Sequence, residues 1–141
     1  HKIPVAGVFS NDKLPDGYTN NRGIIINMAD SAHGGSHWVA LYIEDDRPVY
    51  MDSYGMLAPL EVLAYMKRVC DKNPIALYNQ MQIQSINSGY CGIYCLYFIK
   101  YMSQHRSIMP LEIRLAFFQK QFSPCTSLNL KLLNKYFFWG S

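Results

Sequence analysis

The 141-residue sequence lacks the paired-cysteine spacing of a zinc site and has no long apolar run. No two of its four cysteines are separated by two residues, so we expect no metal. Its longest stretch without a charged or strongly polar residue, Tyr90–Ile99, is about half of the roughly twenty residues of a membrane-spanning helix. No apolar leader follows His1 to Pro4. We therefore expect neither membrane binding nor a secretory signal.

Charged residues are also sparse, at 16% of the chain, and the net charge is only +3. Lys and Arg are scattered and form no dense stripe like that of a nucleic-acid-binding protein, so weak DNA binding is the most we expect. Hydrophobic residues make up 50% and aromatic residues 14%, which excludes a disordered polar chain and predicts a core that needs no disulfides. We expect free thiols, a reducing compartment, and a monomer with a single domain over residues 1–141.

The apolar runs and turn residues predict an α+β domain. Two short runs rich in β-branched and aromatic residues, 23–28 and 37–43, are typical of strands. The polar segment 44–48 predicts a hairpin turn to a third, antiparallel strand that begins at Val49. The other expected elements are a loop over 1–22, a strand over 75–83, a polar loop over 84–90, and helices over 58–71, 91–102, 110–122 and 127–138.

Two of the expected helices differ in their apolar faces. The helix over 58–71 carries Leu60, Leu63, Ala64 and Cys70 at helical spacing, which predicts one buried face. The helix over 91–102 is apolar on nearly every side, which predicts a central, buried helix.

Cys91 stands where a polar loop becomes this apolar helix, a position that favours a reactive thiol. A helix N-terminus offers unpaired N–H groups and the positive end of the helix dipole, and both stabilise a thiolate. A buried cysteine is more often only a small hydrophobic residue. Cys95, one turn further along, is expected to be such an inert thiol.

A thiol nucleophile needs a base, and the base needs an orienting group. His37 begins one expected strand and Asp52 ends the next, so the hairpin would bring both to the same end of the sheet. Gln84 lies seven residues before Cys91, and its amide is a candidate oxyanion donor beside the Cys91 N–H, although Gln82 competes for the role. Taken singly, each of these residues is more often structural than catalytic.

Several segments together resemble the adenovirus maturation protease (adenain) family of cysteine peptidases. They are Gly35–Ala40, with a Gly-x-His-Trp pattern, Gln84–Cys95, with Gln seven residues before Cys, and the upstream segments 7–13 and 23–27. The likeness covers roughly residues 7–100. Adenoviral enzymes usually carry Glu where this chain has Asp52, and Tyr50–Gly55 is instead similar to the Asp-Ser segment of the ubiquitin-like-protein proteases of the same clan.

The resemblance implies a mixed, mostly antiparallel sheet packed against a central helix that carries the nucleophile, with further helices. It implies Cys91 as nucleophile, His37 as general base and Asp52 as orienting acid. It also implies an oxyanion hole made by Gln84 and the Cys91 N–H, with Trp38 packed near the catalytic pair. No cofactor is required for this chemistry. The resemblance also implies activation by a peptide and by DNA, as in the family. The only feature of the sequence that favours binding of either activator is its mild positive charge.

The resemblance further implies a viral endopeptidase of a virophage or Polinton-type DNA virus. Such an enzyme would cleave capsid precursor proteins at Gly-containing sites during virion maturation, in the virion and in the viral factory of the infected cell. Two alternatives stay open. An isopeptidase of the same clan would remove ubiquitin or ubiquitin-like modifiers with the same residues. A non-catalytic capsid- or DNA-associated protein would keep the fold, and its Cys91 would react with iodoacetamide no faster than an ordinary thiol.

Overall fold

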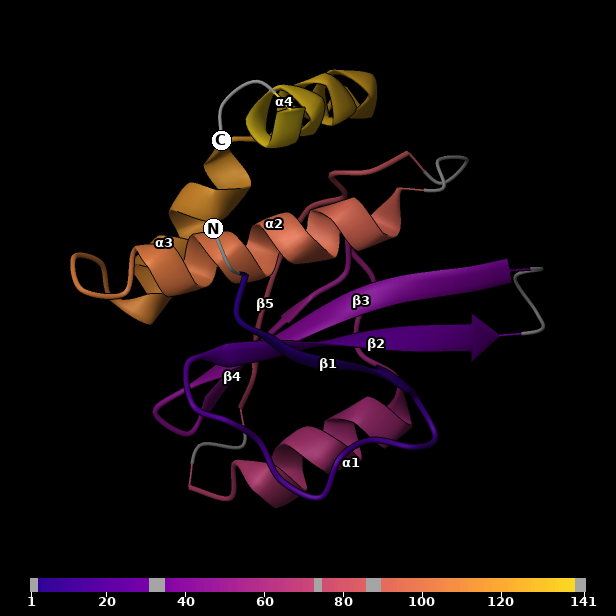
Figure 1. Cartoon of the computed structure of the whole chain (residues 1–141), viewed down its shortest axis with the longest axis vertical. Helices are drawn as coiled ribbons and strands as arrows, with labels where there is room; N and C mark the ends of the chain where they lie inside the picture. Colours follow the sequence, from indigo (N-terminus) through magenta and orange to yellow (C-terminus); the bar gives the residue numbers. More distant parts are fainter. Residues whose placement is uncertain (1–2, 31–34, 73–74, 86–89, 139–141) are drawn as a thin grey trace.

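The computed structural model describes residues 3–30, 35–72, 75–85 and 90–138, which contain a five-stranded sheet with helices on both faces (Figure 1). The strands lie in chain order: β1 (Val5–Ser10), β2 (Arg22–Asp30), β3 (Gly35–Glu44), β4 (Arg47–Met51) and β5 (Leu77–Tyr78). The β2–β3 and β3–β4 ladders are antiparallel, whereas the β1–β2 and β4–β5 ladders are parallel. The predicted α+β class with a mixed sheet is confirmed.

The central strands are apolar on both faces because a helix covers each face. Ile26, Val39 and Leu41 pack towards α1 (Leu60–Val69), whereas the alternate residues Ile25 and Tyr42 pack towards α2 (Cys91–Gln104). Figure 1 shows these two helices on opposite sides of the sheet, with α3 (Leu111–Lys120) and α4 (Thr126–Phe138) beyond α2. Within the described ranges, no helix combines the length and apolar character needed to span a bilayer.

The central helix α2 begins at Cys91, as predicted, and is buried along most of its length. It lies close to β2 at Gly23, where a Cβ atom would come within 2.5 Å of the Ile99 Cγ1 atom. Glycine therefore permits this close approach of strand and helix. The contact helps to fix the position of α2, and with it the position of the Cys91 thiol at the start of the helix.

Two strand predictions were wrong. The N-terminal segment predicted as a loop contains β1, a parallel edge strand with an irregularity between Val5 and Gly7. The turn residues around β1 favour a loop, and the strand forms because it pairs with β2, which follows further along the chain. The strand predicted over 75–83 is paired only at Leu77–Tyr78. Beyond it, the Asn79 side chain accepts from the Asp52 N–H at 3.0 Å and donates to the Asp52 carbonyl at 2.6 Å, and so takes the place of a backbone ladder.

Of the residues predicted for the buried face of α1, Cys70 is buried, but the other three were predicted wrongly. Leu60 has an exposed fraction of 81%, and Leu63 is exposed as well. The buried side chains are Val62, Tyr65 and Met66, at the i, i+3 and i+4 spacing of one helix face. The Tyr65 hydroxyl donates to the Gly17 carbonyl at 2.7 Å, which ties this face to the N-terminal loop. Packing against the sheet thus selects a different stripe from the one that leucine content suggests.

Helix α3 is anchored to the β3–β4 hairpin by Arg114, whose exposed fraction is 1%. Its guanidinium donates to both Glu44 carboxylate oxygens, at 2.7 and 3.2 Å. It also donates to the Met102 carbonyl at 2.9 Å and the Met109 carbonyl at 2.7 Å. We expect Arg114→Leu to lower the free energy of unfolding by about 3–5 kcal/mol, because it leaves the Glu44 carboxylate without its charged partner and three backbone carbonyls without this donor. Urea denaturation followed by circular dichroism measures the loss.

The matched control is Arg47→Leu. Arg47 pairs with Glu112 on the surface, where both side chains remain substantially exposed. A solvent-screened pair of this kind contributes about 1 kcal/mol or less, so this variant should unfold almost like the wild type. Equal losses for the two arginine variants would contradict the anchoring role of Arg114.

Candidate active site

The β3–β4 hairpin brings His37 and Asp52 together, as predicted. Its ladder runs from the Glu44↔Arg47 pair at the turn to the Ala40↔Met51 pair at the open end. Asp52 follows Met51 at this open end, and His37 lies there too, three residues before Ala40. The two-residue turn is formed by Asp45 and Asp46, both at positive φ (51° and 65°), as the tightest hairpins require. The His37 Nε2–H donates to Asp52 Oδ1 at 2.8 Å.

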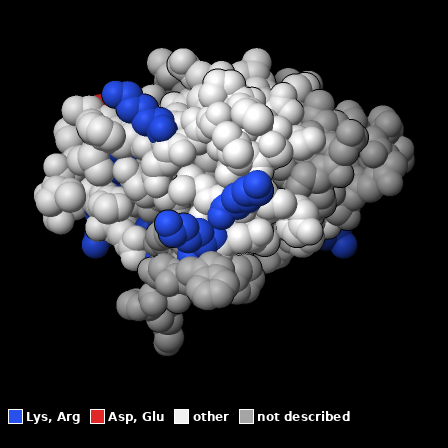
Figure 2. Space-filling model, turned by 90° about the horizontal axis from the view of Figure 1, so that it is seen from above, with Lys and Arg blue, Asp and Glu red and all other residues white. Residues whose placement is uncertain are grey.

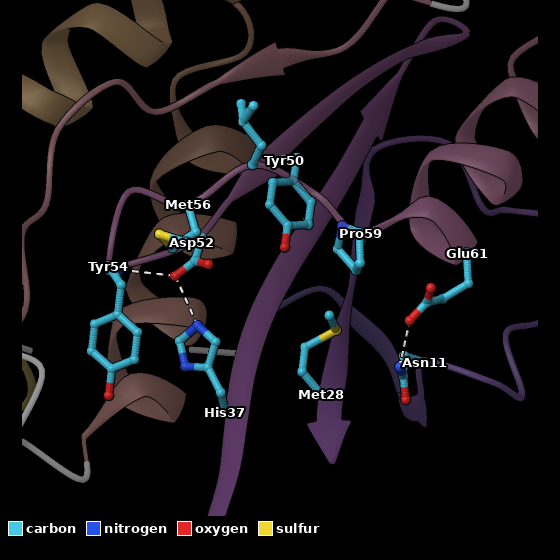
Figure 3. A pocket seen from close by; sticks show the side chains of 10 residues that line it. Asn11, Met28, His37, Tyr50, Asp52, Tyr54, Met56, Pro59 and Glu61 are labelled. Carbon is cyan, nitrogen blue, oxygen red and sulfur yellow. Dashed lines mark hydrogen bonds and ion pairs between the residues drawn. The ribbon is translucent and has the colours of Figure 1, made fainter. Parts of the chain in front are cut away.

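Asp52 and His37 are each held from a second direction. Asp52 is buried, and its Oδ1 also accepts from the Tyr54 backbone N–H at 2.8 Å. The Tyr54 ring stacks on the imidazole, with centroids 4.3 Å apart and planes 12° from parallel. Figure 3 shows the carboxylate between the Tyr54 backbone and the imidazole, with both hydrogen bonds drawn. The orientation of the imidazole is therefore set before any ligand arrives.

The Cys91 thiol lies next to this pair. Its Sγ accepts from the backbone N–H of Trp38, the residue after His37, at 3.4 Å. Nε2 of His37 is bound to Asp52, so Nδ1 is the nitrogen left to exchange a proton with the sulfur. Nδ1 is buried and has no aligned hydrogen-bond partner among the described residues. His37 and Cys91 nevertheless interact, since the imidazole lowers the pKa of Cys91 and the thiol raises the pKa of His37.

The two pKa values move in opposite directions. Burial alone would lower the pKa of His37, but the interactions with Asp52 and Cys91 outweigh it and raise the pKa to about 9. Burial alone would raise the pKa of Cys91, but His37 and the Trp38 N–H outweigh it, so this pKa is below the usual value. A thiolate beside an imidazolium is therefore the favoured state over a window that ends near pH 9.

The neighbouring cysteines lack this environment. Burial raises the pKa of Cys95 far above its usual value, and it raises that of Cys70 to about 12. Cys95 is fully buried one turn along α2, as predicted for an inert thiol. All four cysteines are free thiols in the structure. Among Cys70, Cys91 and Cys95, the thiol that interacts with the imidazole is thus the one whose pKa is lowered.

Gln84 is buried beside the residue that follows Asp52, whereas the competing Gln82 is exposed. The Ser53 hydroxyl donates to Gln84 Oε1. The Ser53 carbonyl accepts from the backbone N–H groups of Ile83 and Gln84, at 2.9 and 3.0 Å. The structure therefore brings Gln84 to the same turn that carries Asp52. Part of the predicted loop between Gln84 and Cys91, residues 86–89, lies outside the described residues.

Three supporting residues were missed by the sequence analysis: Ser53, Tyr54 and Asn79. The first two lie inside the Asp-Ser segment quoted for the resemblance, so the signal was present but had no assigned role. Asn79 holds the backbone of Asp52 through its amide and gives no sequence signal of its own.

A pocket of about 470 Å³ opens beside the imidazole on the α1 side of the sheet (Figure 3). Met28, Tyr50, Leu57 and Pro59 supply apolar walls, and His37 and Asp52 line one end. The other end is polar, where the Asn11 amide donates to Glu61 at 2.6 Å. The pocket therefore offers a mainly apolar binding surface in contact with the candidate base.

No metal cluster accompanies the site in the part of the chain that the structure describes. Among these residues, no group of three or more His, Cys, Asp or Glu side chains could hold a metal ion. Figure 2 shows one face of the molecule, on which Lys and Arg side chains stand at scattered positions between larger uncharged areas. This distribution agrees with the scatter seen in the sequence.

No protein-family model and no curated protein matches the chain. Two solved structures of the ASFV pS273R protease are similar. One has a TM-score of 0.54 and 20% identity, and covers 82% of this chain and 40% of that one. The other, of the selenomethionine protein, has a TM-score of 0.47 and 24% identity, and covers 72% and 43%. The chain thus spans about two-fifths of the ASFV protein's length, and at 20% identity the two share a fold.

Proposed function

We propose that this chain is a cysteine peptidase of a DNA virus, with Cys91 as nucleophile, His37 as proton shuttle and Asp52 as orienting carboxylate. One observation carries the proposal: Asp52 binds Nε2 of His37 at 2.8 Å, while the backbone N–H next to His37 donates to the Cys91 sulfur at 3.4 Å. The thiol, the base and the orienting acid thus occupy one end of the sheet in the order that nucleophilic catalysis requires. The shared fold with a protein named as a protease supports it further.

The chemistry proceeds in two halves. The Cys91 thiolate attacks the carbonyl carbon of a peptide bond, and the oxygen gains a negative charge that the Cys91 N–H and the Gln84 amide stabilise. As the C–N bond breaks, the His37 imidazolium gives its Nδ1 proton to the departing amine, and a thioester remains on Cys91. His37 then takes a proton from water as the water attacks the thioester, and returns it to the sulfur as the acid product leaves. Asp52 holds the ring in the productive orientation throughout.

The proposed substrate is a polypeptide, with capsid precursor proteins as its biological source. The pocket beside His37 supports this class, because its apolar walls and open shape suit a side chain close to the scissile bond. The family resemblance of the sequence supports cleavage at Gly-containing sites. Activation by a peptide or by DNA remains part of the same proposal.

The test begins with a denatured protein library digested by the purified chain, with Cys91→Ala as the blank. Mass spectrometry of the new termini should show a shared cleavage pattern, enriched in Gly beside the cut, that is absent from the blank. Identical termini with and without Cys91 would refute peptidase activity.

Co-expression with candidate capsid precursors then tests the biological substrate. Discrete, Cys91-dependent fragments support maturation, whereas intact precursors argue against it. A ubiquitin-like protein carrying a C-terminal vinyl sulfone distinguishes the isopeptidase alternative. Labelling of Cys91 by that probe, without cleavage of any precursor, would favour the removal of modifiers.

A further inference from the structure

The turn over Asp52–Gly55 contacts several parts of the candidate site in sequence order. Asp52 binds the His37 ring nitrogen, Ser53 binds the Gln84 side chain, and Tyr54 stacks on the imidazole face. The Gly55 N–H donates to the Asp52 carbonyl at 2.8 Å and closes the turn. Gly55 has a φ of 77°, and a Cβ there would lie 3.1 Å from the Gln82 nitrogen. Glycine therefore allows the turn to press against the backbone that leads into Gln84.

Ser53 is the residue of this turn with no part in the Cys-His-Asp chemistry. Its side chain is fully buried, and its hydroxyl donates to Gln84 Oε1. Its carbonyl accepts hydrogen bonds from the backbone N–H groups of Ile83 and Gln84. Ser53 therefore binds both the backbone and the side chain of Gln84. A buried hydroxyl that meets a carbonyl oxygen in this way must use its only proton there.

The two ends of a glutamine amide are chemically opposite, since one accepts and the other donates hydrogen bonds. With Oε1 held by Ser53, the NH2 group is directed to the other side of the amide. If the amide turned over, it would present an oxygen to the developing oxyanion and would repel it. The orientation of Gln84 therefore decides whether its side chain stabilises or opposes the transition state.

We propose that Ser53 is a positioning residue that fixes the orientation of the Gln84 amide, so that its NH2 group, and not its oxygen, faces the oxyanion. The inference rests on the proposed peptidase function. Ser53 acts through Gln84, and Gln84 acts most strongly when the oxyanion forms. Loss of the hydroxyl should therefore lower kcat and leave KM nearly unchanged.

The experiment is a double-mutant cycle on a peptide substrate taken from the library digest. Ser53→Ala is expected to lower kcat about tenfold to a hundredfold, less than or equal to the loss in Gln84→Ala. The double variant Ser53→Ala/Gln84→Ala should match Gln84→Ala within about threefold, because the hydroxyl has nothing left to orient. Losses that multiply in the double variant would overturn the proposal, as would a wild-type kcat in Ser53→Ala.

A second readout separates positioning of Gln84 from damage to the rest of the site. The alkylation rate of Cys91 by iodoacetamide depends on the thiolate and does not use the oxyanion donors, so Ser53→Ala should keep the wild-type rate. A parallel fall of alkylation and kcat would show that Ser53 acts through the Cys-His-Asp group, against the proposal. Fast alkylation in a wild type that cleaves no peptide would instead refute the proposed function and leave no kcat to compare.

Two further variants guard against a simple folding effect. Ser53→Cys fills nearly the same space with a weaker donor, so its kcat should lie between those of the wild type and Ser53→Ala. Ser103→Ala removes a hydroxyl that donates to the Lys100 carbonyl at 3.0 Å near the other end of α2, and it should keep the wild-type kcat. A Ser53→Cys kcat below that of Ser53→Ala would count against the role of the hydroxyl.

Discussion

Replacement of Cys91 by alanine is expected to abolish peptide hydrolysis, with a loss on the order of 10⁴-fold or more. Alanine has no nucleophilic group, so no thioester intermediate can form. His37 and the oxyanion donors then have no covalent step to assist. The substrate pocket and the His37–Asp52 pair stay in place, and binding of the peptide should therefore change little. Steady-state cleavage of a fluorogenic peptide gives kcat, and fluorescence anisotropy of an uncleavable analogue gives the affinity.

Cys95→Ala is the matched control, because it removes a thiol from the same helix one turn away. The Cys95 side chain is fully buried and its pKa is raised, so it takes no part in the chemistry. Its removal should cost some stability and leave kcat/KM within about threefold of the wild type. An active Cys91→Ala enzyme, or a Cys95→Ala enzyme as inactive as Cys91→Ala, would contradict the assignment.

The sequence was most informative where local signals coincide. Apolar runs on either side of a short polar turn predicted the hairpin, and the hairpin alone accounts for the meeting of His37 and Asp52. The change from a polar loop to an apolar run marked the first residue of α2 correctly. Both features depend on residues close together in the chain, and this is the kind of information that a single sequence carries well.

The features that escaped prediction depend on distant partners. The edge strand β1 exists because β2 offers a parallel ladder, and β5 ends where the Asn79 side chain replaces backbone pairing. The contact of Ser53 with Gln84 joins residues 31 positions apart, and its polar partner is visible only in the folded chain. The resemblance to a family supplied the candidate catalytic residues, whereas the groups that contact them in the folded chain required the structure.

His37→Ala is expected to slow alkylation of Cys91 by about tenfold or more at pH 7, and to lower kcat by about 10²–10⁴-fold. Without the imidazole, burial of the thiol dominates and its pKa rises, so less thiolate is present near neutral pH. The rate of iodoacetamide alkylation as a function of pH measures this directly. The exposed thiol of Cys125 should first be replaced in a Cys125→Ser background, which leaves the reaction at Cys91 to be followed by peptide mass spectrometry.

The matched control is His105→Ala, which removes the histidine at the C-terminal end of α2. The helix of 14 residues places it about 20 Å from Cys91. Its alkylation profile should overlay that of the wild type. If His37→Ala gave the same profile as the wild type too, the imidazole would not be the partner of the thiol.

Asp52→Asn extends the argument to the pH dependence of hydrolysis. In the wild type, activity should rise with pH as Cys91 ionises, and should fall again as the His37 imidazolium loses its proton near pH 9. Asparagine removes the carboxylate charge that supports the imidazolium, while the burial that lowers the pKa of His37 remains. The alkaline limb of the kcat profile should therefore move to lower pH in Asp52→Asn. A limb that stays near pH 9 would mean that Asp52 does not set the protonation of His37. A shifted limb, together with the slowed alkylation of His37→Ala, would tie the carboxylate, the imidazole and the thiol into one titrating unit.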